Sequence, residues 1–443
     1  MKKLRYWLRL FTALFAKYYV ILGIGIVFGI ITFFIFPRIS KYLPKWRGTN
    51  SIAVVGRFTS DDIPLFIQHQ ISQGLTTLDS SGRASPAIAT SWEVADGGKT
   101  YIFNLNPHLK WQDGTAFKGR DINYQFRDTI VEYPNDTKLI MKLKDPFAPL
   151  PIAVSRPVFK RGLLGTGSYK VSRVRKNGAY IESLSLVPVD KSGYQPNLIY
   201  RFYSSEASAW LAFKLGIVHS VMDLQDVGDL ASWPNATVTS ESHSDRYVAV
   251  FFNLNNSILS GSAGRNLRLA LTYAIDKSRW PDRADGPINP YSWAYFSDTK
   301  KYNQDLIHAK QLLAKDEKQL SEIQLSTVPA YLPVAEAIKS DWEKLGLKVN
   351  VLVAAEPTAD FTALVIAQAI PLDPDQYNLW HSTQATNLTG LNNPRIDKLL
   401  EDGRKALDFD ERKKIYHEFQ KYLVDEVPAI FLFHPQSYTV SRK

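Results

Sequence analysis

The sequence contains no cysteine among its 443 residues, and this absence excludes several kinds of site. Disulfide bonds and thiolate metal sites both require cysteine side chains. A lipid anchor on an N-terminal cysteine, as in bacterial lipoproteins, is excluded for the same reason. Any tether to a membrane must therefore come from the polypeptide itself.

Motifs of enzyme active sites are also missing. The eight histidines are scattered singly, with no HExxH motif and no pair at helical ligand spacing. Residues 165–170 (GTGSYK) lack the spacing of a phosphate loop, so we expect a tight turn there. No serine lies in a nucleophile-elbow context, and the adjacent acids Asp61 and Asp62 are typical of a solvated loop or a helix cap. We predict a protein that is not an enzyme and uses no metal or cofactor.

Charged residues are absent from one long stretch near the N-terminus. No charge lies between Lys17 and Arg38, and residues 18–37 are nearly all apolar, which is the length of a membrane-spanning helix. The alternative, a cleaved signal peptide, would have a shorter apolar core followed by a small-x-small site. We therefore expect a cytoplasmic basic segment at 1–17, a transmembrane anchor at 18–37 and a tether at 38–49.

Positive charge is concentrated around this predicted anchor. The first 47 residues hold nine basic and no acidic side chains, and the other residues hold 44 basic and 43 acidic ones. Almost all of the net charge of +10 therefore lies near the N-terminus. Such flanking charges face anionic head groups, and we predict no nucleic-acid partner. Five basic residues precede the apolar run and four follow it, which weakly favours a cytoplasmic N-terminus. We expect a single-pass cell-membrane protein with its large domain on the extracellular or periplasmic side.

The rest of the chain has mixed α and β patterns. Apolar residues recur on one helical face from 334 to 345, Gly346 ends that helix, and residues 347–353 then alternate as a strand. A second helix begins at the predicted N-cap Asp408 and leads to the buried strand AIFLF. The length and the 45% hydrophobic content predict at least two α/β lobes. We expect the protein to be a monomer.

Several blocks in order along the chain form a larger pattern. They are SPAIATSWEV, DGGKTYIFNL, KWQDGTAF, LLGTGSYKV, RNLRLALTYAIDKSRW, LDPDQYNLW and DERKKIYHEFQKYLVDEVPAIFLF. This pattern resembles the family 5 extracellular solute-binding proteins, the peptide-binding components of ABC importers. The resemblance implies a two-lobed, type II periplasmic-binding-protein fold with mixed sheets, after one transmembrane helix. It puts crossing strands at 250–255 and 429–433, with lobe I at 50–255 plus 429–443 and lobe II at 256–428.

The resemblance also implies a function and a site. We predict that the lobes capture a small organic ligand, expected to be a peptide, for uptake by an ABC permease and its ATPase subunits. The alternative is a transport-independent receptor or interaction protein with the same fold. The candidate ligand contacts are Arg57, Phe58, Thr59, Arg246, Tyr247, Asn253, Asn255, Asp373, Tyr377 and Trp380. The candidate hinge residues are Val250, Phe251, Phe252, Ile430, Phe431 and Leu432.

Two features depart from the family pattern. The stretch after residue 131 lacks the longer helical subdomain usual in the family, so this is a trimmed version. Peptide-binding members carry an aspartate four residues before the proline of the DP pair, where it holds the ligand's α-amino group, and here that residue is Ile370. A buried ammonium needs a carboxylate partner. Either Asp373 has taken over this role, or the ligand has no free amine.

Overall fold

The computed structural model describes Tyr18, Val20 and residues 48–190, 192–314, 322–356 and 361–443. The predicted cytoplasmic segment and almost all of the predicted anchor and tether lie outside these residues. Among the described residues, no helix has the length and apolarity of a membrane span. Contacts divide the chain into a small unit, Met1–Thr49 with Tyr194–Pro196, and a large unit, Asn50–Gly193 with Asn197–Lys443. The cores, cavities and side-chain contacts below belong to the large unit.

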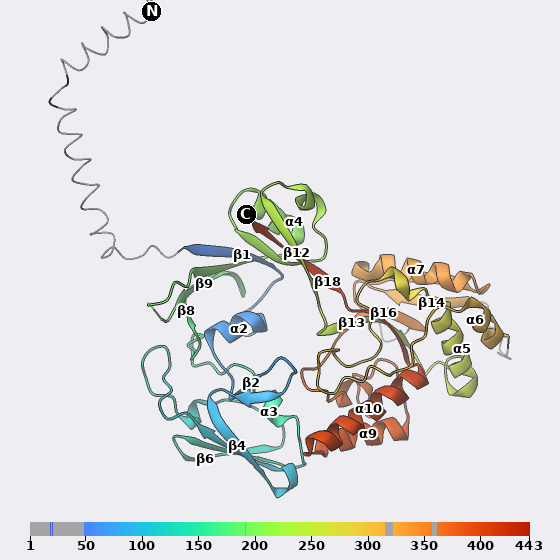
Figure 1. Cartoon of the computed structure of the whole chain (residues 1–443), viewed down its shortest axis with the longest axis horizontal. Helices are drawn as coiled ribbons and strands as arrows, with labels where there is room; N and C mark the ends of the chain where they lie inside the picture. The colour runs from blue at the N-terminus through green and yellow to red at the C-terminus, as the bar shows by residue number, and fades with distance from the viewer. Residues whose placement is uncertain (1–17, 19, 21–47, 191, 315–321, 357–360) are drawn as a thin grey trace, which may run out of the picture. The chain divides into compact units, whose positions relative to one another are not determined.

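A seven-stranded mixed sheet forms one part of the large unit (Figure 1). In sheet order, its strands are β12 (Ala236–Ser242), β18 (Gln436–Arg442), β11 (Ser220–Leu224), β1 (Thr49–Val55), β10 (Asn197–Tyr203), β9 (Tyr180–Pro188) and β8 (Tyr169–Asn177). Helices α2 (Leu65–Ile71) and α4 (Glu206–Lys214) contribute to different cores of this sheet. The adjacent residues Ala53 and Val54 also belong to these two cores, because successive residues of a strand point to opposite faces.

A smaller antiparallel sheet lies next in the chain. Its order is β4 (Ala89–Ala95), β5 (Thr100–Leu105), β7 (Lys138–Leu143) and β6 (Thr129–Asn135), and the short pair β2 (Thr76–Leu78) and β3 (Ala84–Pro86) and helix α3 (Leu150–Ala153) accompany it. Burial alternates strictly along β5, where Tyr101, Phe103 and Leu105 are buried. These side chains form a separate core with Trp111. The sheet is therefore apolar on one face, as a period of two predicts.

A five-stranded sheet organises the second half of the chain. Its order is β15 (Lys348–Val353), β14 (Glu322–Thr327), β16 (Ala363–Ala369), β13 (Arg246–Phe252) and β17 (Ala429–Phe433). Its helices are α5 (Gly261–Ala274), α6 (Leu306–Leu313), α7 (Leu332–Glu343), α8 (Tyr377–Trp380), α9 (Pro394–Lys405) and α10 (Phe409–Glu426). The predicted helix and strand at 334–353 are α7 and β15, and Asp408 caps α10 by accepting from the backbone N–H of Glu411.

The chain passes between the large sheets at residues 243–245 and 434–435. The first passage joins β12 to β13, and the second joins β17 to β18. The buried cores divide at the same places, because one core contains residues only from 247 to 432. We call residues 50–242 with 436–443, without Tyr194–Pro196, the first lobe, and residues 246–433 the second lobe.

These passages differ from the expected crossings at 250–255 and 429–433. The expected hinge residues lie inside the five-stranded sheet, where Ala249 pairs with Phe431 and Val250 pairs with Ile430. Every residue of Val250–Phe252 and Ile430–Leu432 is buried. Packing on both faces holds these strands within the second lobe, so the lobe boundaries at 255 and 429 are corrected to 243–245 and 434–435.

Candidate ligand site

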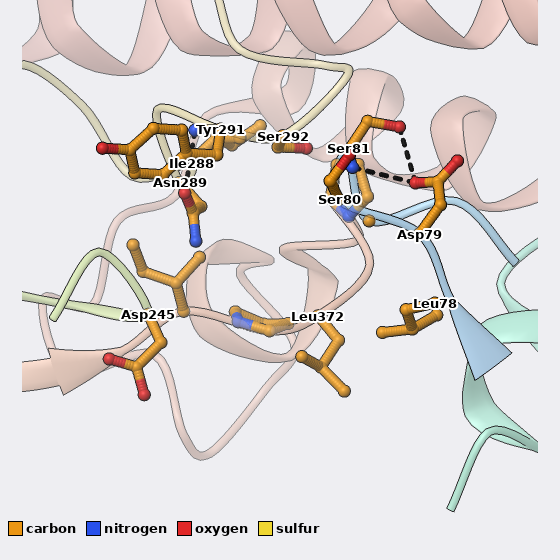
Figure 2. Close-up of a pocket in the computed structure, with 14 residues that line it drawn as sticks. Leu78, Asp79, Ser80, Ser81, Asp245, Ile288, Asn289, Tyr291, Ser292 and Leu372 are labelled. Atoms are coloured by element: carbon orange, nitrogen blue, oxygen red, sulfur yellow. Dashed lines mark hydrogen bonds between the residues drawn. The ribbon is translucent and has the colours of Figure 1, made fainter. Parts of the chain in front are cut away.

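A cavity of about 200 Å³ lies where the two lobes meet (Figure 2). The first lobe contributes residues 78–82, and the second lobe contributes 288–292 and 370–374. Asp245 joins them from the first passage between the lobes. The lining consists of Leu78, Asp79, Ser80, Ser81, Gly82, Asp245, Ile288, Asn289, Tyr291, Ser292, Ile370, Pro371, Leu372 and Pro374. A movement of one lobe against the other would change this cavity directly.

A few direct contacts join the two lobes. The backbone N–H of Trp293 donates to the carbonyl of Ser81 at 3.1 Å. Farther along the interface, the guanidinium of Arg83 lies 4.1 Å from the ring centroid of Phe409. A further backbone hydrogen bond joins Ala148 to the carbonyl of Arg404 at 2.8 Å. The lobes therefore touch through a few small contacts, and not through a shared hydrophobic core.

The cavity has two carboxylates, and both are already hydrogen-bonded. Asp79 accepts from the N–H of Arg83 and from the N–H and hydroxyl of Ser81 at 2.7–2.9 Å. The backbone of Arg83 and the Ser81 hydroxyl hold the pKa of Asp79 below its ordinary value. Asp245 accepts from Nε and Nη2 of Arg246 at 3.2 and 3.3 Å. Each carboxylate thus accepts hydrogen bonds from residues close to it in the sequence.

The rest of the lining is uncharged. Apolar surface comes mainly from Leu78, Ile288, Ile370, Pro371, Leu372 and Pro374. Asn289 accepts from the N–H of Tyr291 through Oδ1 at 2.9 Å. Its Nδ2 group has no partner in the part of the chain that the structure describes. A ligand here would meet apolar walls and a free amide donor.

The three candidates after the first strand lie away from this cavity. Phe58 packs in a first-lobe core, with its ring centroid 5.2 Å from that of Phe202. Arg57 lies over the ring of Tyr180 at 5.8 Å. Thr59 is half-buried and also lies outside the lining. The structure therefore gives these residues structural contacts within the first lobe.

The candidates on and after β13 are also separate from the cavity lining. Arg246 is next to it but pairs with Asp245. The Nδ2 group of Asn253 donates to the carbonyl of Phe361, and Asn255 is exposed. Of these residues, Arg246 alone adjoins the cavity, through its contact with Asp245.

Tyr247 and Trp380 lie together inside the second lobe. They line a separate cavity of about 10 Å³, which has room for one water molecule at most. The Tyr247 hydroxyl and the Trp380 Nε1 group are buried and have no partner among the described residues. Burial raises the pKa of Tyr247, so its phenol stays neutral. Tyr377 stacks on His381 instead, and the guanidinium of Arg404 lies 4.0 Å from the centroid of its ring.

Asp373 pairs with Arg412 in the protein interior. The two Asp373 oxygens lie 2.5 and 3.0 Å from Nη2 and Nη1 of Arg412, and one of them also accepts from the N–H of Asp375. Burial raises the pKa of Asp373, and the facing guanidinium limits that rise. The idea that Asp373 is free to hold a ligand's amine is therefore wrong. Ile370, by contrast, lines the cavity.

Another depression in the surface would not change shape when the lobes close, because it lies within one lobe. A larger depression of about 550 Å³ is lined only by first-lobe residues, including Asp61, Lys160 and Lys176. Among the described residues, no group of three or more acidic or histidine side chains is placed to hold a metal ion. The sequence patterns missed residues 78–82 and 288–292, since DSSG signals a turn but not the partner that the turn faces.

Comparison with known proteins places this chain in a family. The model for "Bacterial extracellular solute-binding proteins, family 5 Middle" matches residues 83–389. The chain belongs to this family. Family 5 consists of solute-binding proteins and not of enzymes.

Relatives in family 5 match over most of their length. The oligopeptide-binding protein AppA of Bacillus subtilis is 22% identical, with 86% of this chain and 84% of AppA covered. The dipeptide-binding protein of Escherichia coli is also 22% identical, and the match covers 81% of this chain and 82% of the Escherichia coli protein. These relatives support the resemblance found in the sequence blocks.

Solved structures agree on the family 5 fold. NikZ from Campylobacter jejuni, solved with Ni(L-His), has a TM-score of 0.72 at 22% identity and covers 90% of this chain and 94% of NikZ. CtaP from Listeria monocytogenes has a TM-score of 0.74 at 18% identity, with 89% and 94% covered. The predicted type II periplasmic-binding-protein fold with mixed sheets is confirmed.

Proposed function

We propose that this protein captures a solute between its two lobes and delivers it to an ABC permease. The observation that carries the proposal is the cavity lined by both lobes and by Asp245 of the first passage. The family and the peptide-binding relatives support a peptide or a peptide-like ligand. The apolar run at 18–37 would tether the large domain to the outer face of the cell membrane.

The two passages between the lobes form the hinge in this proposal. Each passage is hydrogen-bonded to a residue beside the other passage, since His243 pairs with Ser437 at 2.5 Å and His434 Nδ1 donates to the carbonyl of Arg246 at 2.8 Å. Rotation at two short adjacent segments changes the distance between residues 78–82 and 288–292 with little change inside either lobe. The small interlobe contacts each contribute about 1 kcal/mol or less, so closure would be reversible.

The test measures lobe closure in the full-length protein. Because the chain has no cysteine, Arg127→Cys with Ile307→Cys places two unique spin labels, one on each lobe, at exposed positions. The probes are alanyl-leucine, N-acetyl-alanyl-leucinamide and a peptide digest of casein, with the protein in nanodiscs. A bound probe should narrow and shift the distance distribution between the labels. Binding seen by calorimetry without any change in that distribution would contradict capture by closure.

A further inference from the structure

We infer that the interlobe cavity selects a small neutral amide, with no free α-amino group and no free carboxylate inside the cavity. This inference rests on the proposed function and names the class of solute for the same site. Four observations support it: the absence of basic groups in the lining, the engagement of both carboxylates, the inward amide of Asn289, and the cavity's size.

A ligand carboxylate finds no opposite charge in this cavity, and a ligand ammonium finds only carboxylates that already accept hydrogen bonds from the protein. None of its fourteen lining residues is basic, so an enclosed ligand carboxylate would have no cationic partner there. A carboxylate or an ammonium removed from water is stable only when it is paired and hydrogen-bonded. Whether a ligand ammonium can bind in the cavity therefore depends on the two acidic residues in the lining.

Both acidic groups already accept hydrogen bonds from the protein. Figure 2 shows Asp79 turned toward Ser81, with dashed hydrogen bonds between them. The Asp245 carboxylate points away from the other labelled side chains and is paired with Arg246. A ligand ammonium would share Asp79 with the donors of Ser81 and Arg83, which all bind Oδ1. It would have to compete with Arg246 for Asp245. The pair formed by Asp245 and Arg246 is also neutral as a whole, which reduces its attraction for a cation.

The segment 370–374 shows how the second lobe keeps charge out of the cavity. Ile370, Leu372 and Pro374 line it, whereas the carboxylate of Asp373 is buried against Arg412. Ile370 is also fixed in place, because its N–H donates to the carbonyl of Asp245 at 2.7 Å. The wall that faces the ligand is therefore apolar along this segment.

The remaining features favour an amide. The Nδ2 group of Asn289 is a neutral donor suited to a carbonyl oxygen, while Ile288 and Ile370 present apolar surface. The volume of about 200 Å³ is below the roughly 300–1,000 Å³ of sites for drug-sized ligands. A cyclic dipeptide or a short peptide blocked at both ends has this size and chemistry.

The experiment compares three matched probes by calorimetry with the full-length protein in nanodiscs. They are alanyl-leucine, its cyclic form, and N-acetyl-alanyl-leucinamide. We expect at least one neutral probe to bind ten times more tightly than alanyl-leucine or better. Asn289→Ala should weaken the neutral probe about threefold to tenfold, as expected for one hydrogen bond. Asp245→Asn should leave the preference for neutral probes unchanged.

Ile370→Asp adds the missing carboxylate and should improve binding of alanyl-leucine, whereas Ile370→Asn, of similar size but uncharged, should not. Thermal melts check that both variants fold, and the Asn289 and Asp245 variants test the inference if they do not. Tighter binding of alanyl-leucine to the unaltered protein, or its loss in Asp245→Asn, would overturn the inference while leaving solute capture intact. If no probe, including the casein digest, binds or moves the lobe labels, the proposed function fails and the inference fails with it.

Discussion

The two lobes differ in how they bury apolar and charged side chains. The second lobe has one continuous core, whereas the first lobe has three smaller ones. Among the described residues, every buried arginine, lysine and aspartate lies in the second lobe. They are Arg268, Lys277, Asp341, Asp373 and Arg412. The buried polar residues of the first lobe are serines and threonines only. The second lobe therefore buries charged side chains within its core, whereas the first lobe buries only neutral polar ones.

The largest effect should come from breaking the buried ion pair of the second lobe. Arg412→Met would leave Asp373 buried without its partner, and we expect a loss of about 3–5 kcal/mol in the free energy of unfolding. Urea titration of the full-length protein measures it. Adding Asp373→Leu should recover much of the loss, because a matched apolar pair removes the uncompensated charge.

The matched control lies in the first lobe. Lys118 pairs with Asp136 at 3.0 Å, but both side chains are about half exposed. Lys118→Met should cost less than about 1 kcal/mol, since exposed pairs contribute little. Equal losses for Arg412→Met and Lys118→Met would contradict the contrast between the lobes.

A second, smaller effect concerns the buried amine of Lys277. Burial lowers the pKa of Lys277 from 10.5 to about 7, and Nζ donates to the carbonyl of Tyr302. Between pH 7 and 10.5 the unfolded chain binds more protons at this residue, so stability rises with pH across that interval. Below pH 7 both states are protonated, and the full cost of burying the charge remains.

Lys277→Met should therefore raise the melting temperature by a few degrees at pH 6, and this gain should shrink by pH 9. Thermal melts at pH 6, 7.5 and 9 follow the trend. Lys170→Met, at an exposed first-lobe position, is the control and should show no such trend. A gain for Lys277→Met that is constant with pH would show that the cost does not come from the ammonium charge.

The smallest effect should appear at the contact between the lobes. Arg83→Ala removes the cation–π contact with Phe409 and should shift the lobes toward the open state by about 0.5–1 kcal/mol. The spin-label distances measure this shift. Arg57→Ala removes a similar contact with Tyr180 inside the first lobe and should leave those distances unchanged. A shift in both variants would mean that the Arg83 contact does not act at the interface.

The sequence predicted much of the local structure and little of the cavity. The helix and strand at 334–353 and the N-cap at Asp408 follow from periodicity and capping, which act over a few residues. The crossings were misplaced because a buried strand such as β13 has the same apolar pattern in either sheet. The ten proposed contacts were chosen for their chemistry, and none of them lines the interlobe cavity.

The sequence by itself determined the family, the mixed α/β class and the absence of cysteine chemistry, since these depend on composition and on ordered blocks. Ile370 was recognised as a missing carboxylate, but two explanations stayed open. Tertiary structure showed the partner of Asp373, which is Arg412, 39 residues away on α10. It also brought residues 78–82, 288–292 and 370–374 around one cavity. Such long-range packing leaves no local signal, and so only the folded chain shows which charges remain free for a ligand.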